Sequence, residues 1–284
     1  MRSILTTGVL LVMIGGATGA QAQLLPPLLP VCVPLPMSIS GNTAQGSINI
    51  LGIGADVTIG FESVVGLTSN NLNVSACVIS PLDPHYLSRL PDLLKLNAAF
   101  PLVVRVRPRS WSPLAFHGVY TFSFHTHLLF LDPTQPLSLL KAYDGMPFAD
   151  ITKSEGIGSY RDDGSGGDFS EFLIALDLRP IDDVINGKFT ALQALLDDNA
   201  GSIPAPVMDV LQADLSQALA YYQAGNIPAA SSQVSAFTNE VIAHSGGGEI
   251  PDFWQASDPG TVNVAGRLRS AADTLRFSLE RKGS

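Results

Sequence analysis

The sequence predicts an α+β protein, with an N-terminal antiparallel β-sandwich of about eight strands (Ig-like) followed by a C-terminal antiparallel bundle of four helices. A change of hydrophobic period supports this prediction. Before residue 178, apolar and polar residues alternate in short runs, as they do along strands with one buried face. After residue 180, apolar residues recur every three to four positions, as they do on one face of a helix. The predicted boundaries are a signal peptide at 1–22, a Pro/Leu-rich lead-in at 23–37, the sandwich at 38–178 and the bundle at 180–284.

The first 22 residues have the pattern of a secretory signal peptide. Arg2 provides the positive charge, an apolar run follows, and Ala20-Gln21-Ala22 matches the small residues of a cleavage site. The apolar run is too short and too rich in glycine to span a membrane, since a spanning helix needs about 20 apolar residues. We therefore expect a periplasmic or secreted protein with no integral membrane segment after signal cleavage.

The lead-in is rich in Leu and Pro, which favours a stiff, extended segment. It contains Cys32, and the only other cysteine is Cys77. In an exported chain an even number of cysteines favours a disulfide, which would attach the lead-in to the rest of the protein. Two separate buried thiols are the alternative.

The sandwich is predicted from runs rich in β-branched residues, each bounded by Gly, Asn, Ser or Pro. The runs lie at 48–51, 55–61, 72–79, 100–106, 137–141, 148–151, 157–160 and 169–176. A short helical turn is expected within 84–96. The longest strand is expected at 119–131, where aromatic residues alternate with Thr, Ser and His and so predict a core face and a polar face.

Four helical stripes follow, at 184–196, 207–222, 230–241 and 264–279. Glycine-containing breaks separate the first three, and a longer segment precedes the fourth. One apolar stripe on each helix is enough to form a small bundle. Trp254, in the segment before the last helix, is expected to fill the bundle core.

The chain is acidic, with a net charge of −9 and only 14% charged residues. This balance argues against binding to nucleic acid or to an anionic membrane surface, because both attract basic proteins. The expected partner is instead a protein, a glycan or another component of the cell envelope.

Metal binding is one hypothesis for the polar face of the long strand. His125 and His127 are two residues apart, so both imidazoles point to the same face, and His117 joins them if Gly118 does not form a bulge. Two such imidazoles can begin a zinc or copper site, which then needs a carboxylate or a third histidine. The alternative is a pair of polar residues on a solvated sheet face.

A calcium site is a second hypothesis, because residues 162–168 combine glycines with Asp162, Asp163 and Asp168. Calcium binds six to eight oxygens in a flexible loop. The segment lacks the spacing of an EF-hand, and the alternative is a hairpin turn in which glycine supplies positive φ.

Carbohydrate binding is a third hypothesis, based on aromatic residues expected in loops. Trp111 lies in a loop by its composition, and Tyr160 and Arg161 border the glycine-rich segment. Such side chains can stack on a sugar ring. The alternative for a single loop tryptophan is local packing.

No catalytic residue is predicted, since the sequence has no G-x-S-x-G or H-E-x-x-H motif. A facing pair among Asp144, Asp150, Asp162 and Asp163 keeps glycoside hydrolysis open. The leading hypothesis is a non-enzymatic binding or interaction protein without a cofactor. The alternative is a hydrolase of envelope polymers, metal-assisted through His125 and His127.

A resemblance to the extracellular helical module FIMAH is carried by LSQALAYYQAGNIPAASSQVSAFTNEVIAHSGGGEIP and NVAGRLRSAADTL, with the central spacing of Gly225, Ala230 and Phe237. It covers about residues 187–280 and implies a secreted bacterial protein without established catalysis. The whole chain, through PFADI and GSYRDDGSGGDFSEFLIALDLRP, also resembles a family of exported bacterial proteins of unknown function. That resemblance implies export and architecture, and it assigns no activity.

Overall fold

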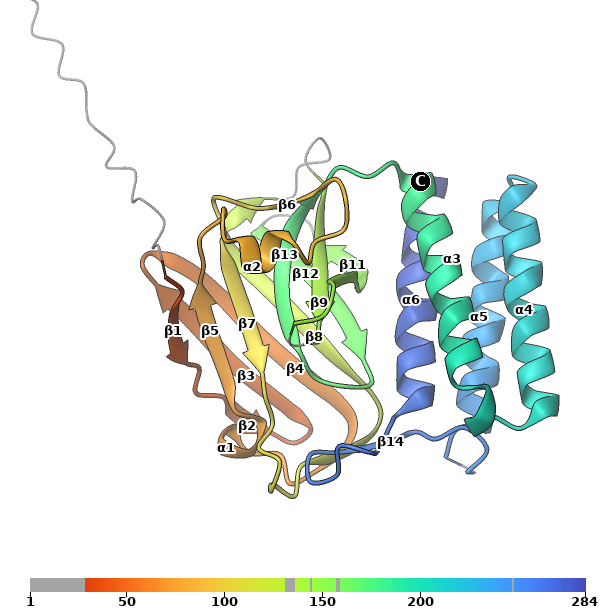
Figure 1. Ribbon diagram of the computed structural model, residues 1–284, viewed down its shortest axis with the longest axis horizontal. Helices are drawn as coiled ribbons and strands as arrows, with labels where there is room; N and C mark the ends of the chain where they lie inside the picture. Colours follow the sequence, from red (N-terminus) through yellow and green to blue (C-terminus); the bar gives the residue numbers. More distant parts are fainter. Residues whose placement is uncertain (1–28, 131–135, 144, 157–158, 247) are drawn as a thin grey trace, which may run out of the picture.

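The structure is a computed structural model that describes residues 29–130, 136–143, 145–156, 159–246 and 248–284. Within these residues, two antiparallel sheets of seven strands each are followed by C-terminal helices (Figure 1). The predicted order of β-structure and then helices is confirmed. The predicted signal peptide at 1–22, residues 23–28 of the lead-in and Asp144 lie outside the described residues. No helix in the described part of the chain has the length and apolarity needed to cross a membrane.

The first sheet has the strand order β1 (Val31–Pro34), β5 (Val74–Val78), β7 (Leu102–Val106), β13 (Glu171–Asp177), β9 (Leu137–Ala142) and β10 (Ala149–Asp150), with β6 (Leu94–Leu96) paired to β13. The second has the order β11 (Thr152–Gly156), β12 (Ser159–Gly166), β8 (Ala115–Phe130), β4 (Ile53–Val65), β3 (Thr43–Ile50) and β2 (Ser38–Ser40), with β14 (Phe253–Gln255) paired to β8.

The expectation of about eight strands is too low, because the described residues form fourteen. The additional strands are mostly short, and a run of two to four residues is too brief to show alternation. The helical turn expected within 84–96 is α2 (Pro84–Leu87), and a second short helix, α1 (Ser69–Leu72), follows β4.

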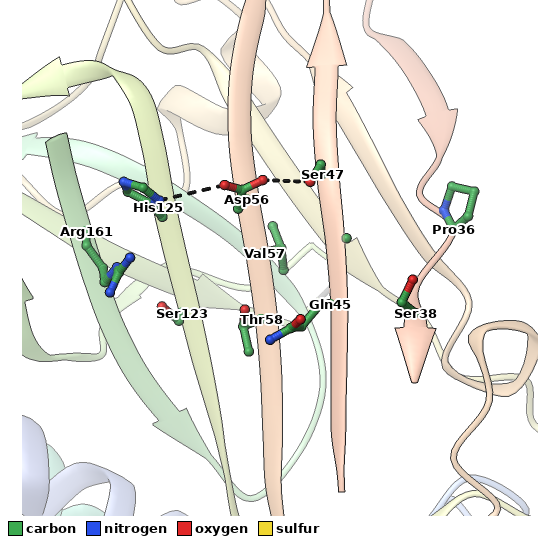
Figure 2. A pocket seen from close by; sticks show the side chains of 11 residues that line it. Pro36, Ser38, Gln45, Ser47, Asp56, Val57, Thr58, Ser123, His125 and Arg161 are labelled. Atoms are coloured by element: carbon green, nitrogen blue, oxygen red, sulfur yellow. Dashed lines mark hydrogen bonds and ion pairs between the residues drawn. The ribbon is translucent and has the colours of Figure 1, made fainter. Parts of the chain in front are cut away.

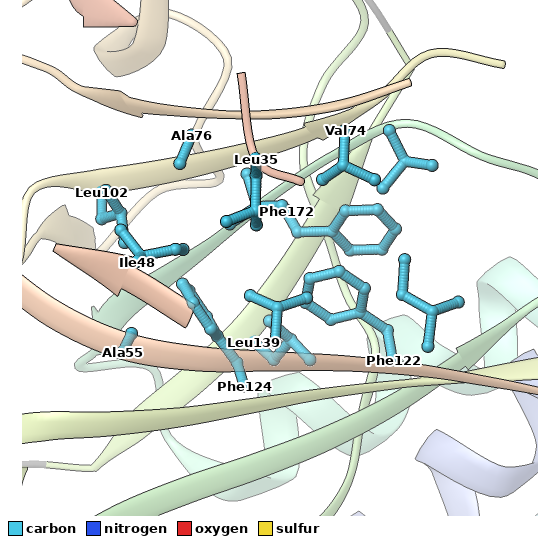
Figure 3. Close-up of a cluster of buried hydrophobic side chains, with 14 of the residues drawn as sticks. Leu35, Ile48, Ala55, Val74, Ala76, Leu102, Phe122, Phe124, Leu139 and Phe172 are labelled. Carbon is cyan, nitrogen blue, oxygen red and sulfur yellow. The ribbon is translucent and has the colours of Figure 1, made fainter. Parts of the chain in front are cut away.

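The inner faces of both sheets contribute to one aromatic and aliphatic core (Figure 3). Tyr120, Phe122 and Phe124 of β8 are completely buried, which confirms the predicted core face of the long strand. Phe122 stacks on Phe172 of the other sheet, with ring centroids 3.9 Å apart and planes 7° apart. The long strand therefore joins the two layers.

The disulfide between Cys32 and Cys77 is present, as predicted. The two cysteines are directly paired residues of the antiparallel neighbours β1 and β5. The described part of the lead-in is therefore not only an extended segment, because it forms the edge strand of the first sheet.

Four longer helices follow the sheets: α3 (Ile181–Asp198), α4 (Ala205–Gln223), α5 (Ile227–His244) and α6 (Val264–Gly283). Their apolar stripes form a second core, separate from that of the sheets, which includes Phe189, Leu211, Phe237 and Leu268. The antiparallel bundle and the Ig-like topology are finer descriptions that stay predictions.

The helices are joined to the sheets through α6, which packs against β8, β11 and β12. The Asn263 side chain donates a hydrogen bond to the Gly118 carbonyl at 2.6 Å, and Ser270 donates to the Ser165 carbonyl at 2.5 Å. A buried ion pair also connects α3 to β10, with Lys188 Nζ 2.7 Å from Asp150 Oδ2.

The predicted boundary at residue 180 is not a clean division. β14, which lies between α5 and α6 in sequence, pairs with the beginning of β8. Trp254 of β14 packs against Phe116 and Phe169, with ring centroids 5.3 and 5.2 Å apart. Trp254 thus contacts the core between the sheets, and the expectation that it fills the helical core is wrong.

The glycine-rich segment is also not a hairpin turn, because residues up to Gly166 belong to β12. None of its glycines has a positive φ. Their small size is what the packing needs: a Cβ on Gly164 would lie 2.5 Å from Ile151 Cδ1, and one on Gly167 would lie 2.8 Å from the Arg267 nitrogen. These glycines allow close approach of neighbouring segments.

Candidate functional site

A row of polar side chains crosses four strands on the outer face of the second sheet (Figure 2). Ser47 on β3 pairs with Asp56 on β4. His125 on β8 lies between Asp56 and Arg161 of β12. These residues share a face because successive side chains of a strand point to opposite faces, and the alternate positions fill the core. A second row, two residues along each strand, consists of Gln45, Thr58, Ser123 and Asp163.

Seven of these eight residues, all except Asp163, line an open groove of about 690 Å³. Its lining is rich in hydroxyl, amide and charged groups, and Ser38 from the edge strand β2 extends it (Figure 2). Among the described residues that line the groove, none is Trp, Tyr or Phe. The groove therefore suits a ligand that is recognised mainly by hydrogen bonds.

Asp56 is the centre of the polar cluster. Its Oδ2 atom accepts a hydrogen bond from His127 Nε2 at 2.9 Å and lies 3.7 Å from His125 Nδ1. The Ser47 hydroxyl donates to Oδ1 at 2.7 Å. The Ser47 hydrogen bond, together with the hydrogen bond and charge of His127, lowers the pKa of Asp56 below its ordinary value. The carboxylate is therefore held in its ionised form between two imidazoles.

The second ring nitrogen of His125 is also engaged. His125 Nε2 and Ser159 Oγ are hydrogen-bonded at 2.6 Å. Ser159, His125 and Asp56 thus follow one another in the order of a nucleophile, a base and an orienting carboxylate. With His127, the same residues also present two imidazoles and one carboxylate, a donor set that transition metals bind.

The predicted histidine pair and a carboxylate therefore come together. Asp56, His125 and His127 each place one possible ligand atom within 4.8 Å of the others, and they form the one such group of three among the described residues. The carboxylate that the sequence left unidentified is Asp56.

His117 does not join this group. A register shift separates the two ends of the β4–β8 pairing, and Gly118 has a φ of +69°. The prediction for His117 depended on the absence of such a bulge. His117 Nδ1 instead lies 3.2 Å from Asp252 Oδ1, so the inclusion of His117 among the metal ligands is wrong.

The structure does not gather the predicted calcium ligands. Asp162 is buried, with Oδ2 accepting from the Tyr160 hydroxyl at 2.7 Å. Asp163 is its neighbour in β12 and points to the outer face, where it accepts from the Ser154 hydroxyl at 2.8 Å. Asp168 forms ion pairs with Lys141 and Arg267. A strand separates adjacent carboxylates, whereas a loop could have brought them together.

The predicted sugar-binding residues are also separated. Tyr160 is completely buried, so the expectation that it stacks on a ligand from solvent is wrong. Trp111 is 67% exposed. The guanidinium carbon of Arg109 lies over the Trp111 ring, 5.5 Å from the ring centroid. Only Arg161 of the three lines the groove.

Sequence reasoning missed Ser47, Asp56 and Ser159. The alternation along residues 55–61 places Asp56 on a polar face, which was the available signal. That signal was insufficient because strand order and register, which bring Asp56 beside His125, arise from pairing between distant segments.

Two comparisons bear on identity. A family model described as a family of unknown function, DUF6689, matches residues 10–282. A search of curated proteins finds no match to the chain. The resemblance of residues 187–280 to FIMAH stays a prediction.

Proposed function

Since the chain belongs to DUF6689, a family of unknown function, we propose from its site that it is an exported, non-enzymatic binding protein of the bacterial envelope or extracellular space. The ligand is a glycan of the envelope. The observation that carries this proposal is the open groove on the second sheet, which two rows of hydrogen-bonding side chains border.

The arrangement suits a chain of sugar hydroxyls. Neighbouring strands are about 4.8 Å apart, so each row offers donors and acceptors at regular intervals. Gln45 provides both an amide donor and an acceptor, Arg161 provides only donors, and the hydroxyls of Thr58 and Ser123 provide both. A ligand with many hydroxyl groups can satisfy these groups without stacking on an aromatic ring.

The finer architecture belongs to the same proposal. The two sheets form an Ig-like sandwich that presents the groove, and α3–α6 form a FIMAH-like antiparallel bundle that serves as a spacer or docking domain. The stacking of Phe122 on Phe172 between the sheets supports the first part. The shared core of the four helices supports the second. The Cys32–Cys77 disulfide supports export, because disulfides persist in oxidising compartments.

An array of bacterial envelope glycans, including peptidoglycan fragments, tests the proposal. The double variant Gln45→Ala/Arg161→Ala should bind the recognised glycan at least tenfold more weakly, since both side chains are exposed in the groove. Trp111→Ala is the matched control, because it removes an exposed side chain outside the groove. If Trp111→Ala loses glycan binding and the double variant retains it, the glycan binds at the loop of Trp111 and not in the groove. Absence of any glycan binding by the unmodified protein would reject the proposal.

A second candidate function is ester hydrolysis on an envelope polymer, and the Ser159–His125–Asp56 order favours it. In this reaction Ser159 Oγ would attack the ester carbonyl carbon while His125 Nε2 takes the hydroxyl proton, and Asp56 would orient the imidazole. As the C–O bond of the ester breaks, His125 would give the proton to the departing alcohol, and water would then hydrolyse the acyl–Ser159 ester to release the acid. A serine-reactive fluorophosphonate probe tests it. Labelling should be lost in both Ser159→Ala and His125→Ala, and labelling that persists in Ser159→Ala would eliminate this candidate.

A further inference from the structure

We infer that Asp56, His125 and His127 bind one divalent transition-metal ion, with Zn²⁺ as the best-matched ion, on the outer face of the second sheet. The ligand atoms are Asp56 Oδ2, His125 Nδ1 and His127 Nε2. This inference goes beyond the proposed binding function, because it concerns the ion alone and holds whichever polymer the groove recognises.

The spacing of the three atoms is close to what zinc requires. Asp56 Oδ2 lies 2.9 Å from His127 Nε2 and 3.7 Å from His125 Nδ1. Tetrahedral zinc, with bonds of about 2.0–2.1 Å, places its ligand atoms about 3.3 Å apart. The two distances lie on either side of that value. Small rotations of the side chains therefore create the site, and the ion takes the place of the proton now shared by His127 and Asp56.

Two of the atoms that would not bind the ion, one on His125 and one on Asp56, already have partners. Ser159 is hydrogen-bonded to Nε2 of His125, which leaves Nδ1 directed toward Asp56. Ser47 donates to Oδ1 of Asp56, which leaves Oδ2 for the ion. Partners of this kind orient the ligands of metal sites and select the histidine tautomer.

The backbone opposite His127 also makes room for its ring. Gly54 faces His127 across the β4–β8 pair, and a Cβ at Gly54 would lie 3.0 Å from His127 Nδ1. A larger residue at position 54 would press against the imidazole. Gly54 therefore leaves room for the imidazole of His127 beside the carboxylate of Asp56.

The donor set decides the class of ion. Two imidazole nitrogens and one carboxylate oxygen suit zinc or copper, whereas calcium and magnesium prefer sites made only of oxygen. The side chains of His125, His127 and Asp56 are 27%, 48% and 42% exposed, so an ion reaches them from solvent. Three protein ligands leave the fourth position of a tetrahedral ion to water or to a group of a ligand in the groove.

Calorimetric titration of the tag-free, disulfide-bonded protein with ZnCl₂ tests the inference, with CaCl₂ as the comparison ion. We expect one equivalent of Zn²⁺ to bind and no heat from Ca²⁺ under the same conditions. His125→Ala and His127→Ala should each weaken Zn²⁺ binding at least tenfold. His117→Ala is the matched control, because it removes an exposed imidazole from the same strand outside the cluster and should leave binding unchanged.

A second measurement keeps the test independent of folding and of catalysis. In ¹⁵N NMR spectra of the histidine rings of the unmodified protein, Zn²⁺ should shift Nδ1 of His125 and Nε2 of His127 and leave the ring nitrogens of His117 unshifted. In each alanine variant, unchanged signals of the remaining histidines without Zn²⁺ show that the variant is folded. Unchanged ring signals at saturating Zn²⁺ would overturn the inference, as would stoichiometric binding by the double variant His125→Ala/His127→Ala. Zn²⁺ binding is measured without substrate or probe, so the metal inference and the hydrolase candidate are tested by separate measurements.

Discussion

Asp162 points into the core between the sheets, where the hydroxyl of Tyr160 donates to its Oδ2 atom. Its Oδ1 atom is buried without a hydrogen-bond partner among the described residues. Burial raises the pKa of Asp162 well above its ordinary value, and the hydrogen bond from Tyr160 only partly opposes this. The folded protein therefore holds a proton on Asp162 over a pH range in which the unfolded chain has lost it.

This difference predicts how stability depends on pH. Because the pKa of Asp162 is higher in the folded state, its contribution to stability is lost as pH rises from about 4 through the folded-state pKa. Asp162→Asn removes the need for the proton, so we expect it to be more stable than the unmodified protein at pH 7, by about 1–3 kcal/mol. Urea unfolding at pH 5, 6, 7 and 8 measures this.

Asp163→Asn is the control, because its side chain faces outward and should change the free energy of unfolding by less than about 0.5 kcal/mol. An Asp162→Asn variant that is less stable than the unmodified protein across this pH range would contradict the prediction.

At the scale of residues, the sequence predicts which side chains share a face of a strand better than it predicts which residues of different strands lie close together. The positions of His125 and His127 on one face follow from their spacing alone, and the structure agrees. Asp56 is 71 residues from His127 in sequence, and only strand pairing brings the two together. The acids in the glycine-rich segment misled the calcium hypothesis because glycine is common both in loops and where backbones pack closely.

At the scale of elements, α6 approaches the second sheet closely where a glycine, Gly167, follows β12. A Cβ on Gly167 would lie 2.8 Å from the nitrogen of Arg267 and 2.9 Å from the carbonyl oxygen of Asn263. Both are backbone atoms at the beginning of α6, so neither can move aside without shifting the helix. We expect Gly167→Ala to destabilise the protein by about 1–3 kcal/mol, as overpacked sites do.

Gly187→Ala is the matched control for this prediction. Gly187 lies inside α3, and a Cβ there would meet nothing within 4 Å. Alanine is a better helix former than glycine by about 0.8–1.0 kcal/mol, so Gly187→Ala should raise stability. Thermal unfolding of both variants gives the comparison, and equal effects of the same sign would show that close packing of α6 is not the cause.

The buried Lys188–Asp150 pair is a second link between elements. Lys188 Nζ also donates to the hydroxyls of Thr274 and Ser278, at 2.6 and 2.8 Å. Lys188→Met should destabilise the protein by about 3–5 kcal/mol, because it leaves the buried Asp150 carboxylate with only the more distant guanidinium of Arg179, at 3.8 Å. The double variant Lys188→Met/Asp150→Asn should recover much of this loss, since it removes the charge as well. Denaturant unfolding measures both, and a double variant less stable than Lys188→Met would contradict the explanation.

At the scale of the whole molecule, the order of sheets and then helices could be read from periodicity, but the joining of the two parts could not. β14 is three residues long, too short for a pattern, and it lies beyond α5. The same limitation hid β1, whose four residues precede the predicted sandwich. Short strands are defined by the partners they meet, which depend on the completed fold.

The disulfide is expected to contribute to the free energy of unfolding of the whole molecule. Cys32 and Cys77 are separated by 45 residues, and closing such a loop in the unfolded chain contributes about 4 kcal/mol in the chain-entropy model. Cys32→Ser/Cys77→Ser should lose about this much free energy of unfolding, measured with urea. Dithiothreitol should lower the stability of the unmodified protein similarly and leave the double variant unaffected. A reductant-sensitive double variant would show that the effect has another source.

The return of β14 to β8 also has a consequence for how the protein is made. A ribosome delivers β8 long before residues 253–255, and three helices emerge in between. Until then Phe116 and Phe169 lack the indole of Trp254, and the beginning of β8 lacks β14. The nascent chain therefore completes its second sheet only after α3, α4 and α5 have been synthesised.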